Sequence, residues 1–394
     1  MKLLKGGRLF TVSHGILENT DILIKDKTIF KIEENIIPSS ETEIIDICGK
    51  RVYPGLIDCH THLGLDEEGD WENKNELNEM GDPITPQLRA IDGFYPKDRA
   101  IKEAVSAGIT TVITTTGSIQ TISGQAAAIK LIPDSHVSEM LLDPCVGIKG
   151  GLGENPKYFY QKMQKMPTSR MGSAYLIRQI LSDTIAYQKG WHPREDGKSF
   201  WNQKEKLKVL NLLFDKKIPW RVHAHRDYDI LTALRIAREF DINVVIEHAT
   251  EAPLIVDELI NSKAGVVIGP VGFTVSKKTE ADYPILENLN VLVQRGIRFA
   301  FCTDHPIISL SHLPQAVAQA IHYGLSEEKA LQAITINAAE ILGMPDRIGS
   351  IDIGKDADLI IADGSIFDFN TSIKMVLVNG NVVVKKKYLS KNIQ

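Results

Sequence analysis

Short apolar segments alternate with amphipathic segments through the centre of the chain, and this alternation limits the fold more than any other feature. From residue 97 onward, apolar positions spaced for one helical face end at Gly108 and run into the strand-like segment Thr-Thr-Val-Ile-Thr. The same order recurs at predicted helices over residues 230–240, 253–262 and 284–295. Repeated units of this kind over residues 55–345 predict a (β/α)8 TIM barrel. An open doubly wound sheet is the alternative, but no glycine-rich nucleotide loop follows an early strand.

Both ends of the chain lack this helical spacing. The first fifty residues alternate apolar and polar positions in short runs that are split by turn residues, as strands do. Residues 357–363 and 375–384 behave alike, and Asn379-Gly380 is a strong hairpin signal. We therefore predict a small β-sandwich domain built from residues 1–54 and 346–394, with the barrel of residues 55–345 inserted into it.

Composition excludes several classes of partner. The chain has 394 residues and a formal net charge of -5, without a long block of lysine and arginine, so we expect neither nucleic acid nor a membrane as partner. A small-molecule substrate fits better, and a homo-oligomer is kept open. The four cysteines are too sparse for a disulfide framework, and no apolar run has signal or membrane length. These features predict a cytoplasmic protein.

Histidines at strand ends are the most informative residues. The run that starts at Tyr53 ends in His60-Thr-His62, and residues two apart on a strand point to the same side. Active sites of barrels lie at this carboxyl end of the strands. Ligand-type side chains follow further apolar runs at His223, His248 and Asp304. Neutral imidazoles with a carboxylate predict a site for zinc or a similar divalent ion, whereas surface histidines would explain only one such strand end.

These segments resemble the metal-binding strands of the amidohydrolase superfamily. The resemblance rests on Pro-Gly-x-Ile-Asp-x-His-x-His before residue 63, on Val-His-Ala, Glu-His-Ala and Thr-Asp-His-Pro, and on Gly-Lys-Asp-Ala-Asp-Leu-Ile from Gly354. Residues 82–86 (Asp-Pro-Ile-Thr-Pro) and 153–157 (Gly-Glu-Asn-Pro-Lys) are most similar to the imidazolonepropionase-like and prolidase-like branch. The resemblance spans nearly the whole chain and implies a metal-dependent hydrolase.

The resemblance also implies roles for individual residues around one or two divalent ions, most simply zinc. It makes metal ligands of His60, His62, His223 and Asp304. His248 would bind a second metal or, with a single metal, contact the substrate and the attacking water. His225 would contact substrate, and a packing role for this histidine is the alternative.

Relatives with two metals bridge them with a carboxylated lysine, and Lys149 follows a short apolar run. A buried amine with a lowered pKa can take up carbon dioxide in this way. Lys149 lies farther before His223 than the family pattern expects, Lys130 ends a similar run, and Glu154 offers a carboxylate instead. We expect Lys149 to be the bridge and keep the other two as alternatives.

The implied reaction is cleavage of a C–N bond in a cyclic amide, a dipeptide or an N-acyl amino acid. The metal would activate water for attack on a carbonyl, and Asp304 would act as general base and then general acid. Deaminases of this kind place a glutamate three residues after the fifth-strand histidine, where this chain has Arg226. Deamination of a heterocycle is therefore the alternative. A non-catalytic scaffold is a further alternative, although all ligand positions are retained.

Overall fold

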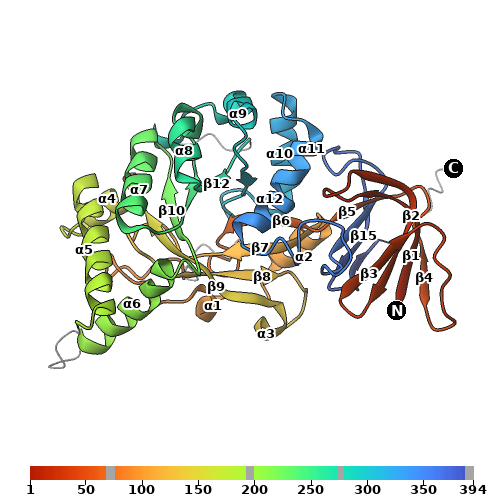
Figure 1. The fold of residues 1–394 in the computed structure, drawn as a ribbon, viewed down its shortest axis with the longest axis horizontal. Coiled ribbons are helices and arrows are strands. Elements are labelled where there is room, and N and C mark those ends of the chain that lie inside the picture. Colours follow the sequence, from red (N-terminus) through yellow and green to blue (C-terminus); the bar gives the residue numbers. More distant parts are fainter. Residues whose placement is uncertain (68–75, 192–198, 273–278, 387–394) are drawn as a thin grey trace.

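The computed structural model describes residues 1–67, 76–191, 199–272 and 279–386. Figure 1 shows an α/β part beside an all-β part, and the first and last described strands lie together in the all-β part. Among these residues, no helix combines the length and apolar character needed to cross a membrane.

One sheet of eight strands forms the centre of the α/β part. Its order is β13-β12-β11-β10-β9-β8-β7-β6. The strands are β6 (Leu56–Thr61), β7 (Ile109–Thr114), β8 (Gln125–Lys130), β9 (Leu141–Gly151), β10 (Trp220–Ala224), β11 (Val244–His248), β12 (Gly265–Ile268) and β13 (Ala300–Phe301). Apart from the first five residues of β9 and the first of β12, every residue in them is buried, as expected for a sheet that is covered on both faces.

The eight strands form a nearly closed barrel, but the sheet is not all parallel as predicted. β8 runs antiparallel to both β7 and β9. No helix lies in residues 115–124 between β7 and β8. A parallel pair needs a crossover connection, which is usually a helix, so the chain instead reverses direction and β8 pairs antiparallel with β7. Lys130, the last residue of β8, therefore pairs with Thr111 near the start of β7.

No ladder pairs the first and last strands of the barrel, β6 and β13, but hydrogen bonds join the carboxyl end of β6 to the residues that follow β13. The His62 backbone N–H donates to the carbonyl of His305 over 2.8 Å, and the Asp304 N–H donates to the carbonyl of His60 over 3.2 Å. The side chain of Asp58, on β6, also accepts hydrogen bonds from the backbone and hydroxyl of Thr303. This seam brings the end of β6 beside the segment that follows β13.

Helices cover the outside of the barrel (Figure 1). The predicted helices are present as α2, α7, α8 and α9; α2, for instance, begins where the Asp98 side chain accepts from the N–H of Ala100 and buries Ile101, Ala104 and Val105. The helices are α1 (Ala90–Gly93), α2 (Arg99–Ser106), α3 (Val137–Met140), α4 (Glu154–Lys162), α5 (Arg170–Gln188), α6 (Ser199–Phe214), α7 (Asp227–Phe240), α8 (Val256–Ser262), α9 (Ile285–Gln294), α10 (Leu313–His322), α11 (Glu327–Ala333) and α12 (Ile336–Ile341). Short 3-10 helices lie at Ala252–Leu254, Thr279–Ala281 and Leu310–His312.

The all-β part combines strands from both ends of the chain. They are β1 (Lys2–Phe10), β2 (Ile16–Lys25), β3 (Thr28–Glu33), β4 (Glu43–Asp46), β5 (Arg51–Pro54), β14 (Leu359–Ala362), β15 (Ile373–Val378) and β16 (Asn381–Lys385). Hydrogen bonds join them into one branched sheet, because the long β1 pairs with β4 along its first half and with β5 along its second. A β-rich domain is thus present, and its packing as a sandwich stays a prediction. The exact domain boundaries stay a prediction.

Candidate metal centre and active site

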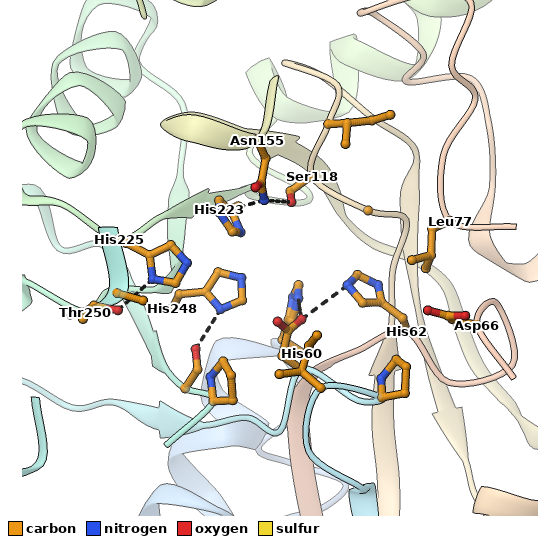
Figure 2. A pocket seen from close by; sticks show the side chains of 18 of the residues that line it. His60, His62, Asp66, Leu77, Ser118, Asn155, His223, His225, His248 and Thr250 are labelled. Carbon is orange, nitrogen blue, oxygen red and sulfur yellow. Dashed lines mark hydrogen bonds and ion pairs between the residues drawn. The ribbon is translucent and has the colours of Figure 1, made fainter. Parts of the chain in front are cut away.

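A cavity of about 600 Å³ lies at the carboxyl ends of the barrel strands. Five histidines from three strand ends line it together with Asp304, and Figure 2 shows their rings around a common space. The histidines are His60, His62, His223, His225 and His248. The structure thus brings together every histidine that the sequence analysis selected, while their roles stay predictions.

The first group of possible ligands joins the two ends of the barrel seam. The Nε2 atoms of His60 and His62 lie 3.0 and 3.3 Å from the same oxygen of Asp304. Nδ1 of His62 is 2.7 Å from the carbonyl of Thr115, so Nδ1 carries the proton and Nε2 is left with a lone pair. A lone pair and a carboxylate that face each other in a buried site fit a cation between them.

The second group lies on β10 and β11. One ligand atom from each of His223, His225 and His248 can be chosen so that all lie within 4.8 Å of one another, and His248 also belongs to such a set with His60 and Asp304. Nδ1 of His248 is 2.7 Å from the carbonyl of Gly269, which directs its Nε2 lone pair into the cavity. Burial, together with the neighbouring histidines, lowers the pKa of His248 well below its usual value.

Two of these residues have an unusual backbone conformation. His248 has φ +73° and Asp304 has φ +52°, in the left-handed region that residues other than glycine rarely adopt. His248 is the last residue of β11, and Asp304 lies three residues after the end of β13. Local strain of this kind is characteristic of functional sites.

Asp304 is ionised despite its position among buried groups. Burial by itself would raise the pKa of its carboxyl group, but His248, His60 and His62 outweigh this effect and hold the pKa well below the usual value. A carboxylate is therefore available at the site at neutral pH.

A layer of three charged side chains lies beneath the histidines, and the sequence analysis had named only Lys149 among them. Glu247 accepts from Nε of Arg221 over 2.8 Å, forms an ion pair with Lys149, and has an oxygen 2.9 Å from Nδ1 of His60. The side chains of Arg221, Glu247 and Lys149 are all completely buried. Burial would lower the pKa of His60, but the charge of Glu247 outweighs it and the pKa is raised. Charged residues within otherwise apolar strands were the signal that could have revealed this layer.

The structure separates the three residues considered for a metal bridge. Lys149 lies next to the histidines through Glu247. Lys130 lies at the other end of the barrel and pairs with Asp356 and Asp358, because β8 runs in the opposite direction. Glu154 begins α4, and its carboxylate accepts from the hydroxyl of Thr279 over 3.3 Å. Lys149 thus shares Glu247 with His60, and its role as a bridge between metals stays a prediction.

Two further residues at the site were not predicted. Asp58 accepts hydrogen bonds from the N–H of His60 and from Thr303, and burial raises its pKa to about 7. The side-chain amide of Asn155 lies 2.7 Å from the Ser118 hydroxyl and 3.2 Å from Nε2 of His223, inside the cavity. Asp58 stands two residues before His60, in the His-x-His motif, and Asn155 lies in the segment of residues 153–157, but the sequence analysis gave neither residue a role.

The chain is similar to known proteins over part or nearly all of its length. The model of the amidohydrolase family matches residues 207–383. A crystal structure of an amidohydrolase from Thermotoga maritima MSB8 superposes with a TM-score of 0.91 at 38% sequence identity, covering 98% of this chain and 100% of that one.

Three curated relatives are more distant. Amidohydrolase tasK of Hapsidospora irregularis is 26% identical over 91% of this chain, adenine deaminase 4 of Rhizobium meliloti is 24% identical over 96%, and an imidazolonepropionase of Fusobacterium nucleatum is 24% identical over 94%. The alignments span 39%, 56% and 93% of those proteins, respectively, so the chain corresponds to only part of the first two.

Proposed function

This chain belongs to the amidohydrolase family, and from that premise we propose that it is a metal-dependent hydrolase that cleaves a C–N bond at the barrel mouth. The observation that carries the proposal is the direction of the imidazole nitrogens. Nδ1 of His62 and Nδ1 of His248 are both held by backbone carbonyls, so both Nε2 lone pairs face the space beside Asp304. This donor set suits a divalent cation, and zinc is the ion that we propose.

The residues of the first group would bind the ion and handle the proton. A divalent ion supplies an activated water and polarises the carbonyl that is attacked. Asp304, ionised and 3.0 Å from Nε2 of His60, would accept a proton on its carboxylate and deliver it to the departing nitrogen. This transfer is needed because an amine leaves only once it is protonated.

The second group would either hold another ion or orient the substrate. His223 and His248 present Nε2 atoms to the cavity, and His225 stacks on His248 with ring centroids 4.8 Å apart. We propose His223 as a ligand, His248 as a ligand or a substrate contact, and His225 as a substrate contact.

Charge favours the proposal that Lys149 is carboxylated. Among the buried side chains of Lys149, Arg221 and Glu247, two are cations and one is an anion. An uncompensated positive charge is costly in the interior, and a neighbouring divalent ion would add to the cost. Conversion of the amine to a carbamate would replace this excess positive charge by a negative one, which supports a two-ion site.

We propose an amide, in a cyclic amide, a dipeptide or an N-acyl amino acid, as the bond that is cleaved. Arg226 occupies the position where a deaminase would need a proton-donating glutamate, and its guanidinium donates to the carbonyl of Thr279 over 2.9 Å. Similarity to an adenine deaminase keeps deamination as the second candidate.

The test combines metal analysis with a substrate screen. Purified protein would be analysed for divalent ions, reconstituted with zinc, and screened against the three amide classes and against aminated heterocycles. Release of an amine or amino acid is expected. Release of ammonia from a heterocycle would favour the deaminase, and failure to bind any divalent ion would contradict the proposal.

A further inference from the structure

We infer that Glu247 is a positioning residue that fixes His60 from behind and thereby strengthens metal binding at Nε2 of the same ring. The inference rests on the metal centre proposed above. It concerns a residue that contacts neither the cavity nor, in our proposal, the ion.

His60 differs from the other candidate ligands in what lies behind its ring. Its Nδ1 is 2.9 Å from a carboxylate oxygen of Glu247, whereas Nδ1 of His62 and of His248 face neutral backbone carbonyls. On the other side, Nε2 of His60 lies 3.0 Å from Asp304. His60 is thus held between two carboxylates, one at the cavity and one in the layer beneath it.

A carboxylate behind an imidazole affects how the ring binds a cation. It favours the proton on Nδ1, leaves Nε2 as the ligand atom, and makes that atom a stronger donor. Loss of such a partner typically weakens metal binding about 10- to 100-fold. Among the described candidates, His60 would therefore be the ligand that is most dependent on its partner.

Glu247 is itself fixed by the strand that carries His60. Arg221 donates from Nε to Glu247 over 2.8 Å and from Nη2 to the carbonyl of Cys59 over 2.8 Å. Cys59 directly precedes His60, so one carboxylate is tied to both the ring and the backbone of this residue. These contacts leave Glu247 little freedom to move away from the ring.

The experiment measures binding of Zn²⁺ and Co²⁺ to the full chain, without any substrate. Glu247→Gln keeps the shape of the side chain and removes its charge, and we expect metal affinity to fall about 10- to 100-fold, with an altered Co²⁺ absorption spectrum. Asp358→Asn is the matched control, because Asp358 pairs with another buried lysine, Lys130, at the opposite end of the barrel, and here metal affinity should be unchanged. Equal affinities of wild type and Glu247→Gln would overturn the inference.

A double-mutant cycle distinguishes positioning from a general structural effect. If Glu247 acts through His60, the Glu247→Gln effect on affinity should largely disappear in a His60→Ala background. Additive losses would contradict the inference. Should Glu247→Gln not fold, Glu247→Asp keeps the charge but shortens the reach, and affinity equal to wild type would again overturn it. If the wild-type protein binds neither ion, it is the proposed metal centre that fails.

Discussion

Two buried lysines lie at opposite ends of the barrel, and they have different charged neighbours. Lys130 pairs with Asp356 over 2.6 Å and Asp358 over 2.9 Å, and Arg347 provides a second cation on Asp356. Lys149 instead shares a single carboxylate with Arg221. The first cluster is balanced in charge, whereas the second has an excess of positive charge next to the candidate metal centre.

The difference indicates that one cluster serves the fold and the other serves the site. The Lys130 cluster connects β8 to the segment around β14, and Asn379 accepts from the lysine as well, so it ties the barrel to the all-β part. The Lys149 cluster ties β9 to β10 and β11 directly below the histidines. A buried charge excess is unfavourable for stability, so its presence is better explained by chemistry.

Replacing one aspartate at each end of the barrel by asparagine, Asp304 at the candidate site and Asp358 near Lys130, should give the largest difference in turnover. Asp304→Asn in the metal-loaded enzyme is expected to reduce turnover by at least about 10²- to 10⁴-fold, because the general base is lost. Asp358→Asn should leave turnover unchanged and lower the melting temperature, because it removes one partner of buried Lys130. Turnover would be measured on a substrate from the screen and unfolding by thermal denaturation. Unchanged turnover in Asp304→Asn would remove this residue from the proposed role.

Replacing Lys130 or Lys149 by methionine tests the two charge clusters separately. Lys130→Met leaves two carboxylates in a nearly buried cluster, and we expect a loss of about 3–5 kcal/mol in the free energy of unfolding. Lys149→Met should cost less, since Glu247 keeps Arg221 and His60, but it should reduce the bound metal if the lysine bridges two ions.

Urea unfolding and metal analysis of both variants measure these effects. Lys130→Met is expected to keep the wild-type metal content. A Lys149→Met variant that retained the wild-type metal content would argue against a carboxylated bridge.

The same comparison indicates what could be learned from sequence. The strand ends that carry histidines could be predicted from sequence. An apolar run followed by His-x-His indicates a strand, and the two-residue spacing places both imidazoles on the same side of it. The sequence could not show which of Lys130 and Lys149 lies near the histidines, because both follow apolar runs. The direction of the strand decides at which end of the barrel each lysine lies. Direction depends on the missing helix between β7 and β8, and partners such as Glu247 and Arg221 depend on the register between β10 and β11.

Asp58→Asn tests whether the seam between β6 and the segment after β13 supports the site. Its expected effect on stability is smaller than that of Lys130→Met. The two oxygens of Asp58 accept from the N–H of His60 over 3.1 Å and from the N–H of Thr303 over 3.0 Å, whereas an amide at this position has only one oxygen and would turn its NH2 group toward one of these donors. We expect a loss of about 1–3 kcal/mol in unfolding free energy and weaker Zn²⁺ binding. Wild-type stability together with wild-type Zn²⁺ affinity would show that the seam does not depend on Asp58.

In the metal-free protein, the difference in unfolding free energy between wild type and Asp58→Asn should depend on pH. Burial raises the pKa of Asp58 from 3.8 to about 7, so the folded state holds a proton that the unfolded state has released. The stabilisation due to this proton is complete below about pH 4, falls as pH rises, and is lost above about pH 7. Asparagine does not titrate, so the advantage of wild type over Asp58→Asn should shrink between these values in urea unfolding. If the advantage of wild type instead grew with pH, the folded state would stabilise Asp58 as a carboxylate and not as the neutral acid.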